Sequence, residues 1–190
     1  MAQKISGHYK LMGVHDMAAG FVFQADSFKF YCYYGAIDRF AEGSFAINND
    51  TIVLKSNKEP GNDFAITKQT KAPGLYNIKV SAPNEYLAQY TICIVMKGEK
   101  TETFTADKNG LIRFDAAKDA KVYIKNELFA DIPTLLKDES SADNYFEVTM
   151  KESLQQLSFK GIDLFIKADE LTWHPNYFIA AENVRFVKED

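Results

Sequence analysis

Apolar and polar residues alternate at every second position over much of this chain, and no long stretch shows the spacing of an amphipathic helix. The alternation is clearest in Ser27–Tyr34. One side of this stretch carries Phe28, Phe30, Cys32 and Tyr34, and the other carries Lys29, Tyr31 and Tyr33. Because successive side chains of a strand point to opposite faces, this pattern predicts a strand with one buried face. A chain made mainly of such segments is predicted to be all-β.

Short strands joined by tight turns are expected along the rest of the chain. Before residue 71 they are His8–Val14, Phe21–Phe23, Gly43–Ile47, Thr51–Ser56 and Phe64–Thr67. After residue 75 they are Tyr76–Val80, Tyr90–Met96, Thr101–Thr105, Leu111–Asp115, Lys121–Asn126, Phe146–Met150, Leu157–Phe159, Leu164–Ile166, Leu171–Trp173 and Val184–Val187. Turns are predicted at Gly35–Asp38, at Asn48–Asp50 and, as a hairpin, at Asp107–Gly110, because Gly, Asn and Asp tolerate left-handed backbone angles.

Composition supports a folded chain and excludes some classes of function. Hydrophobic residues make up 46% of the 190 residues and aromatic residues 14%, so a disordered chain is excluded. The formal net charge of −4 argues against nucleic-acid binding through bulk positive charge. No apolar run reaches the roughly 18 residues of a membrane span, so no transmembrane segment is expected.

The N-terminus and the cysteines bear on the cellular compartment. Met1–Ile5 has no apolar segment typical of a signal peptide, but Ala2-Gln3 also fits a mature N-terminus whose signal was removed. Export to the periplasm or cell surface is therefore expected, with a cytoplasmic location as the alternative. Cys32 and Cys93 both lie in apolar strands, so we expect two buried thiols, with a disulfide between distant segments as the alternative.

The strand pattern stops near Lys71 and resumes near Asn144. It predicts a discontinuous outer domain, 5–70 plus 144–188, and an inserted domain, 75–126. The segment 127–143 is predicted to be a connecting loop, because it contains Pro133 and the polar run Lys137–Ser141. Two consecutive sandwiches are the alternative arrangement.

The middle block contains Thr105-Ala106-Asp107-Lys108-Asn109-Gly110-Leu111-Ile112-Arg113-Phe114, followed by Val122-Tyr123-Ile124. This resembles the transthyretin-like or carboxypeptidase-regulatory-like β-sandwich family, in which Thr-Asp precedes a turn ending in Asn-Gly and an apolar strand. Ala106 departs from that pattern because it stands between Thr105 and Asp107. The resemblance covers Leu75–Asn126 and implies an accessory or adhesive module of an exported protein, without catalysis.

The outer segments resemble a small lipocalin-like barrel. The opening strand is carried by Gly7-His8-Tyr9-Lys10-Leu11, the meander by Asp26–Phe30, Gly43–Phe45 and Thr51–Leu54, and the closing strands by Glu170-Leu171-Thr172-Trp173 and Arg185-Phe186. The resemblance implies an antiparallel lipocalin-like barrel or sandwich, with the transthyretin-like sandwich inserted into it.

The sequence contains no motif of a known catalytic or cofactor site. His-Glu-x-x-His, a phosphate-binding loop, a dinucleotide glycine fingerprint and Gly-x-Ser-x-Gly are all missing. The histidines, His8, His15 and His174, lack the converging partners that zinc needs. Asp107 and Asn109 lack the further oxygen ligands of a calcium loop. No catalytic residue, metal or cofactor is therefore expected.

Two aromatic clusters are the candidate ligand-binding residues. They are Tyr31, Tyr33, Tyr34, Asp38 and Arg39 in the first, and Trp173 and His174 in the second. In one interpretation, Arg39 stabilises a turn by forming ion pairs with Asp38 and Glu42. In the other, its guanidinium group binds a carboxylate or phosphate ligand that the tyrosines flank. If the chain ends close one barrel, both clusters are expected at the same mouth.

These observations predict a non-catalytic, exported β protein that binds a small molecule or a protein partner. A structural or adhesive accessory module is the first alternative. A hydrolase with an unrecognised site is the second, because no nucleophile–base pair is visible in the sequence.

Overall fold

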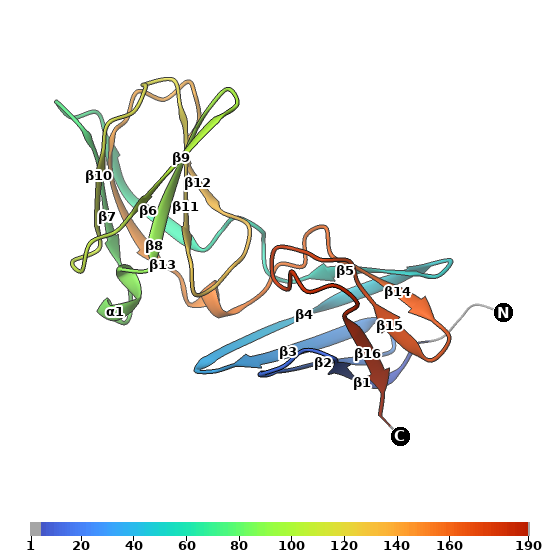
Figure 1. Cartoon of the computed structure of the whole chain (residues 1–190). Coiled ribbons are helices and arrows are strands. Elements are labelled where there is room, and N and C mark those ends of the chain that lie inside the picture. The colour runs from blue at the N-terminus through green and yellow to red at the C-terminus, as the bar shows by residue number, and fades with distance from the viewer. Residues whose placement is uncertain (1–4, 190) are drawn as a thin grey trace. The chain divides into compact units, whose positions relative to one another are not determined.

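The structure is a computed structural model that describes residues 5–189. It divides into two compact units, one made of the segments up to Glu59 and from Gln155 onward, and the other of Pro60–Leu154 (Figure 1). The all-β prediction is confirmed, since the described helices are single turns, α1 (Glu85–Ala88) and the 3-10 turn η1 (Glu152–Gln155). Residues 1–4, on which the expectation about an N-terminal signal depends, lie outside the described part of the chain.

Eight antiparallel strands close into a barrel in the first unit. The five before the second unit are β1 (Gly7–Met12), β2 (Met17–Gln24), β3 (Ser27–Tyr34), β4 (Ile37–Asn48) and β5 (Thr51–Ser56). The three after it are β14 (Asp163–Lys167), β15 (Glu170–Thr172) and β16 (Arg185–Lys188). Each pairs with the next in this order, and β16 returns to β1, so the first and last strands lie side by side (Figure 1).

Two strand pairs join the segments that the second unit separates in the sequence. Leu11 of β1 lies opposite Phe186 of β16, and Val53 of β5 lies opposite Asp163 of β14. The neighbouring β4–β5 hairpin turns at Asn49, whose φ of 53° is in the left-handed region. These pairings make the barrel from residues more than a hundred positions apart.

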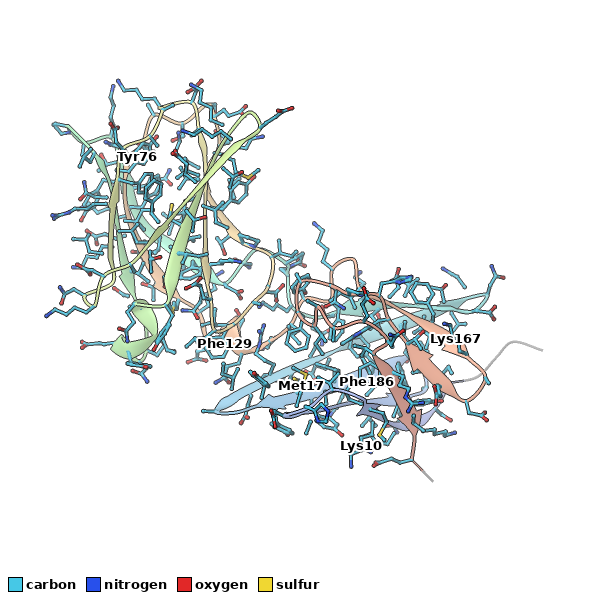
Figure 2. All side chains as sticks on the ribbon, viewed as in Figure 1. Lys10, Met17, Tyr76, Phe129, Lys167 and Phe186 are labelled. Atoms are coloured by element: carbon cyan, nitrogen blue, oxygen red, sulfur yellow. The ribbon has the colours of Figure 1, made fainter. Side chains whose placement is uncertain are left out.

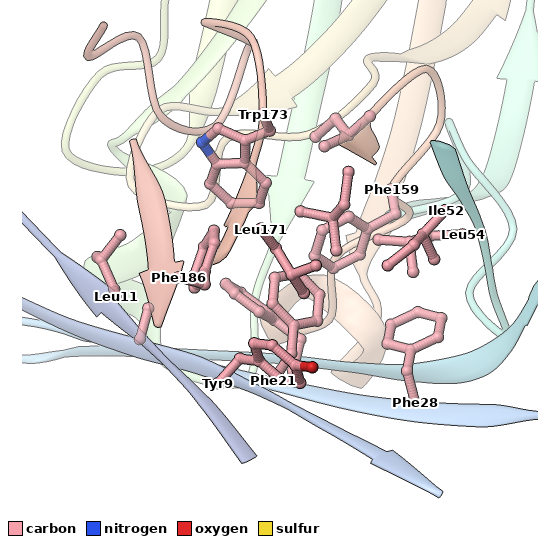
Figure 3. Packing of buried hydrophobic residues seen from close by; sticks show 14 of the residues in the cluster. Tyr9, Leu11, Phe21, Phe28, Ile52, Leu54, Phe159, Leu171, Trp173 and Phe186 are labelled. Carbon is pink, nitrogen blue, oxygen red and sulfur yellow. The ribbon is translucent and has the colours of Figure 1, made fainter. Parts of the chain in front are cut away.

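Aromatic side chains fill the barrel interior (Figure 3). The ring of Phe21 lies 4.7 Å from that of Phe30 and 5.0 Å from that of Phe186, measured between centroids, and all three side chains are buried. Some outward-facing residues of the barrel strands are charged, such as Lys10 of β1 and Lys167 of β14, which Figure 2 labels. An eight-stranded barrel is just wide enough for its side chains to fill, so this interior is a packed core.

The second unit contains two four-stranded sheets. The first has the order β10 (Leu111–Phe114), β7 (Tyr76–Ser81), β13 (Tyr145–Met150) and β6 (Phe64–Thr70). The second has the order β12 (Thr134–Lys137), β11 (Lys121–Asn126), β8 (Thr91–Lys97) and β9 (Lys100–Thr105). Tyr76 and Phe104 each stack on Phe114, at 4.9 and 4.5 Å between ring centroids, which joins the two sheets through their inner faces.

Strand pairing places two predicted outer strands in the second unit. β6 and β13 were assigned to the outer domain, but β13 pairs antiparallel with β6 and parallel with β7. The second unit therefore runs from Pro60 to Leu154. The expected boundaries at residues 70 and 144 were wrong because a parallel pair between distant strands leaves no local turn signal.

The predicted loop 127–143 contains a strand. Within it, β12 pairs with β11, and Lys137 is buried at the end of β12. Its Nζ donates hydrogen bonds to the carbonyls of Lys118, at 2.5 Å, and Ala120, at 3.0 Å, and desolvation lowers its pKa. The sequence predicts a solvated loop at Lys137–Ser141 because lysine is rarely buried, and Lys137 is an exception.

Three shorter predictions also need correction. The turn at Gly110 joins β9 and β10, which lie in different sheets, so it is no hairpin, although Gly110 has a φ of 73°. Leu157–Phe159 is irregular chain, and both end residues are buried in the barrel core. The turn expected at Gly35–Asp38 is confined to Gly35–Ala36, because β4 begins at Ile37.

Both cysteines are free and buried, Cys32 in β3 and Cys93 in β8. Burial raises the pKa of the Cys32 thiol to about 11 and that of the Cys93 thiol to about 12. None of the helical turns in residues 5–189 has the length and apolar character needed to cross a membrane.

Candidate functional site

A groove of about 920 Å³ lies over the outer face of β14, β15 and β16. Its floor contains a row of three cross-strand neighbours, because Thr172 lies opposite Phe165 on one side and opposite Arg185 on the other. The chain between β15 and β16 bounds the groove through Trp173, His174 and Val184. Such a volume is within the range of small-molecule sites, roughly 300–1,000 Å³.

Trp173 belongs to the barrel core and is also one of the residues that line the groove. Its side chain is 3% exposed, and its ring lies edge-on to Phe186 at 5.0 Å between centroids. The indole nitrogen points away from Leu171 and Phe186 (Figure 3). This Nε1–H group is buried and has no acceptor among the described residues. The ring packs against Phe21 and Phe159 as well as Phe186, so this donor is enclosed in the barrel core and closed to solvent.

Charged and aromatic side chains line the groove. Arg185 Nη1 donates to Glu170 Oε1 at 3.3 Å, a half-exposed ion pair between β15 and β16. His174 lies edge-on to Phe165, with 4.9 Å between ring centroids. Lys167 of β14, labelled in Figure 2, also lines the groove. Asp50 and Glu182 add two exposed carboxylates from the turn after β4 and the chain before β16.

Arg39 lies in the barrel interior, on the opposite face of β4 from Asp38 and Glu42. Its side chain is 3% exposed, whereas both acidic residues are exposed. Its Nε donates to the Gln155 carbonyl and its Nη2 to the Gln156 carbonyl, each at 3.1 Å. The expected pairing of Arg39 with Asp38 and Glu42 in a turn is wrong, because strand alternation sends the side chains to opposite faces.

The three tyrosines of the first cluster lie on or beyond the outer face of β3. Tyr33 and Tyr34 are exposed, and the rings of Tyr31 and Tyr33 lie 5.6 Å apart between centroids. Tyr31 covers Gly20 of β2, where an added Cβ would lie 2.6 Å from the Tyr31 hydroxyl. These tyrosines therefore do not flank Arg39, which faces the interior.

Tyr31, His8 and Glu189 form a hydrogen-bonded series on the outer surface. A Glu189 carboxylate oxygen contacts His8 Nδ1, and His8 Nε2 lies 2.8 Å from the Tyr31 hydroxyl. This order resembles that of a carboxylate–imidazole–nucleophile triad. However, desolvation, with further contributions from Glu189 and Tyr33, raises the pKa of Tyr31 above its ordinary value of 10.0. The phenolate is therefore disfavoured, and the series binds β1, β3 and the end of the chain together.

The structure thus separates the predicted site residues. Trp173 and His174 line the groove over β14–β16, Arg39 lies inside the barrel, and the tyrosines and Asp38 lie outside it. Phe165 and Arg185 belong to the groove and were missed. Their signal was available, because each is on the polar side of an alternating strand, where an exposed aromatic residue or a scarce arginine is notable.

His15 is exposed in the turn before β2 and lines none of this groove. Within residues 5–189, no three His, Cys, Asp or Glu side chains are grouped so that they can hold a metal ion. No protein-family model, curated protein or solved structure matches the chain.

Proposed function

We propose that this is a non-catalytic binding protein whose barrel unit holds a small ligand in the groove over β14–β16. The observation that carries the proposal is the groove itself, of about 920 Å³, whose floor holds Phe165, Thr172 and Arg185 in one cross-strand row. Small-molecule sites commonly combine apolar or aromatic side chains with a few polar groups, as this row does.

A lipocalin-like assignment of the barrel and a transthyretin-like assignment of the second unit belong to the same proposal. The up-and-down order of the eight strands supports the first, and the two four-stranded sheets support the second. The ligand position differs from a barrel with an open lumen, because aromatic rings occupy this interior. Export is the remaining part of the proposal, and fractionation of the cells that produce the protein tests it.

The test of ligand binding is a small-molecule screen by proton–nitrogen NMR. Trp173 is the only tryptophan, so its indole N–H gives a single resonance from a residue that lines the groove. Compounds that bind in the groove are expected to move this resonance, because they change the surroundings of a residue that lines the groove. A diverse screen at millimolar concentration that leaves the resonance in place would overturn the proposal.

A structural or adhesive accessory module is the second candidate. It is favoured by exposed aromatic residues on the outer face of β3 and β4, with Tyr33 50% and Phe40 43% exposed. Such residues are enriched where proteins meet partners. If the protein self-associates through them, Tyr33→Ser with Phe40→Ser is expected to abolish the oligomer in sedimentation velocity and leave the Tm unchanged. A wild-type protein that sediments as a monomer at all concentrations contradicts self-association.

A further inference from the structure

We infer that the second unit pairs with a second copy of this chain along the free edge of β9, so that the two four-stranded sheets that contain β9 become one continuous sheet. The inference goes beyond the proposed function, because it concerns the second unit and makes no use of the groove. Three features carry it: the unprotected edge of β9, the direction of its free backbone groups, and the order of its side chains.

Of the four edge strands in the second unit, β9 is the least protected. Proteins protect strand edges against pairing with other chains by bulges, by short strands and by proline. β6 and β12 pair with their neighbours through a register irregularity, and β10 has only 4 residues. β9 has 6 residues and no proline, and its pairing with β8 runs from Thr105 to Lys100 without a register shift. None of the described strands pairs with its other edge.

The backbone groups at this free edge belong to three threonines. The N–H of Ala106, the residue after β9, donates to the Thr91 carbonyl at 2.9 Å, so it points toward β8. Backbone groups of alternate residues point to the same side of a strand, so those of Thr101, Thr103 and Thr105 point away from β8. All three residues are exposed. The edge therefore presents a row of N–H and C=O groups to solvent.

Antiparallel pairing of this edge with itself satisfies the whole row. When a two-fold axis passes through Thr103, that residue faces Thr103 of the second copy, and Thr101 faces Thr105 of the second copy. These are hydrogen-bonded positions, at which each pair of facing residues exchanges two backbone hydrogen bonds. Facing threonine side chains also stabilise a strand pair. The same patch is used by both copies, as a two-fold dimer requires, and this identifies a second copy as the occupant.

The two charged residues of β9 do not oppose this pairing. Lys100 Nζ lies 3.1 Å from Glu102 Oε1, so each charge already has a partner of opposite sign on its own strand. In the register centred on Thr103, Lys100 faces Ala106 of the second copy and Glu102 faces Phe104. Like charges therefore do not face each other along β9.

The first test is sedimentation velocity of the full chain at micromolar to millimolar concentration. A reversible monomer–dimer equilibrium is expected, because an interface of one strand edge is small and small interfaces are weak. Thr103→Pro removes the N–H group at the two-fold axis and is expected to weaken the dimer at least about tenfold, since both copies lose a hydrogen bond. The monomer should still fold, because proline is accepted at an edge strand where its missing N–H would face solvent.

Thr103→Val is the matched control, because it keeps the N–H group and the β-branched shape. Its dimer is expected to be within about threefold of the wild-type affinity, since only the contribution of the side-chain hydroxyl is lost. A wild-type protein that is monomeric at all concentrations overturns the inference. So does a folded Thr103→Pro protein that dimerises as tightly as the wild type.

Cysteine substitution tests the register and does not depend on the proline variant. Residues that face each other at a hydrogen-bonded position have Cα atoms about 5.5 Å apart, within the range that a disulfide bridges. Thr103→Cys is therefore expected to form a disulfide-linked dimer under mild oxidation. In the same register Thr101→Cys lies more than about 13 Å from its own copy, four residues along the strand, and should form none. The native Cys32 and Cys93 are buried, so the wild-type protein is expected to stay unlinked. Equal linking of both variants, or linking of neither, overturns the inference.

This dimer is distinct from self-association through the exposed aromatic residues of β3 and β4. Tyr33→Ser with Phe40→Ser is expected to leave the β9 dimer intact, because both residues belong to the barrel unit. An oligomer that is lost in that double variant and kept in Thr103→Pro overturns the β9 inference and supports the accessory module. The binding of small molecules in the groove is measured separately, so its failure leaves this inference unchanged.

Discussion

Arg39 is a cation inside a barrel whose other buried side chains are mainly aromatic and aliphatic. Its guanidinium donates to the carbonyls of Gln155 and Gln156 and lies over the ring of Phe178, 5.6 Å from its centroid. Lys58 Nζ donates to the same Gln156 carbonyl at 2.7 Å. Two cations therefore hold the short segment where the chain returns to the barrel, and both serve the fold of that segment.

Replacing Arg39 tests this role. Arg39→Ala is expected to lower the free energy of unfolding by about 2–3 kcal/mol, because hydrogen bonds from a charged group contribute about 1.5–3 kcal/mol and their loss leaves carbonyls unsatisfied. Chemical denaturation measures the change. Arg113→Ala, whose side chain is exposed on β10, is the control and is expected to change stability by less than about 0.5 kcal/mol. Equal effects of the two substitutions would contradict the role assigned to Arg39.

The thiols make a prediction about pH. Both cysteines have folded-state pKa values above the ordinary 9.0, at about 11 and about 12, so the folded protein favours the neutral thiol. The stability that this provides is complete below pH 9 and is lost as the pH rises from 9 through the folded-state values. Urea unfolding should therefore show lower stability at pH 10 than at pH 8, and a thiol reagent at pH 8 should label neither cysteine until urea is added. Rapid labelling of the native protein would contradict this account.

The alternation of apolar and polar residues predicted correctly which face of a strand a side chain points to, where the strand itself was placed correctly. It placed Cys32 on the opposite face of β3 from Tyr31 and Tyr33, because neighbouring residues of a strand point to opposite faces. It failed at Arg39, because a one-residue error in where a turn ends moves a side chain from the outer surface to the core. The unpaired indole of Trp173 was beyond prediction, because it depends on neighbours distant in the sequence.

At the scale of elements, the β4–β5 hairpin depends on one residue with left-handed backbone angles. Asn49 has a φ of 53°, and Asn48 and Thr51 pair on either side of the turn. Asn49→Val is expected to destabilise the protein by about 1–2 kcal/mol, because a β-branched residue is strained in this region. Asn49→Gly should change stability little, since glycine adopts this conformation freely. The difference in Tm between the two variants measures the strain, and equal Tm values would mean that the turn does not require it.

Element prediction succeeded where the signal is local and failed where it is not. The turn after Asn48 was predicted correctly, because Asn and Asp at adjacent positions are typical of hairpins. The strand β12 was missed because its last residue, Lys137, is buried, whereas a lysine in a polar run is expected at the surface. The placement of β13 was missed because its partners, β6 and β7, are more than 60 residues earlier in the chain.

At the scale of the whole molecule, the barrel requires both ends of the chain. A fragment ending at Asn57 contains β1–β5 and lacks β14, β15 and β16. We expect it to be insoluble, because β1 and β5 would expose unpaired edges and the core would lose Phe159, Trp173 and Phe186. Expression followed by centrifugation measures this. A soluble fragment with a cooperative melting transition would mean that the first five strands are a domain by themselves.

The pairing of β5 with β14 is the point at which the two segments of the barrel meet beside the groove, and it can be measured by disulfide trapping. Val53 and Asp163 are Cα partners, and bridged cysteines need Cα atoms about 4.4–6.8 Å apart. A protein carrying Val53→Cys and Asp163→Cys is expected to form this disulfide under mild oxidation, as shown by mass spectrometry of the linked peptides. A control carrying Val53→Cys and Val22→Cys, on the distant strand β2, should not cross-link within the molecule. Cross-linking of the control alone, or of neither protein in the folded state, would contradict a barrel closed from both ends of the chain.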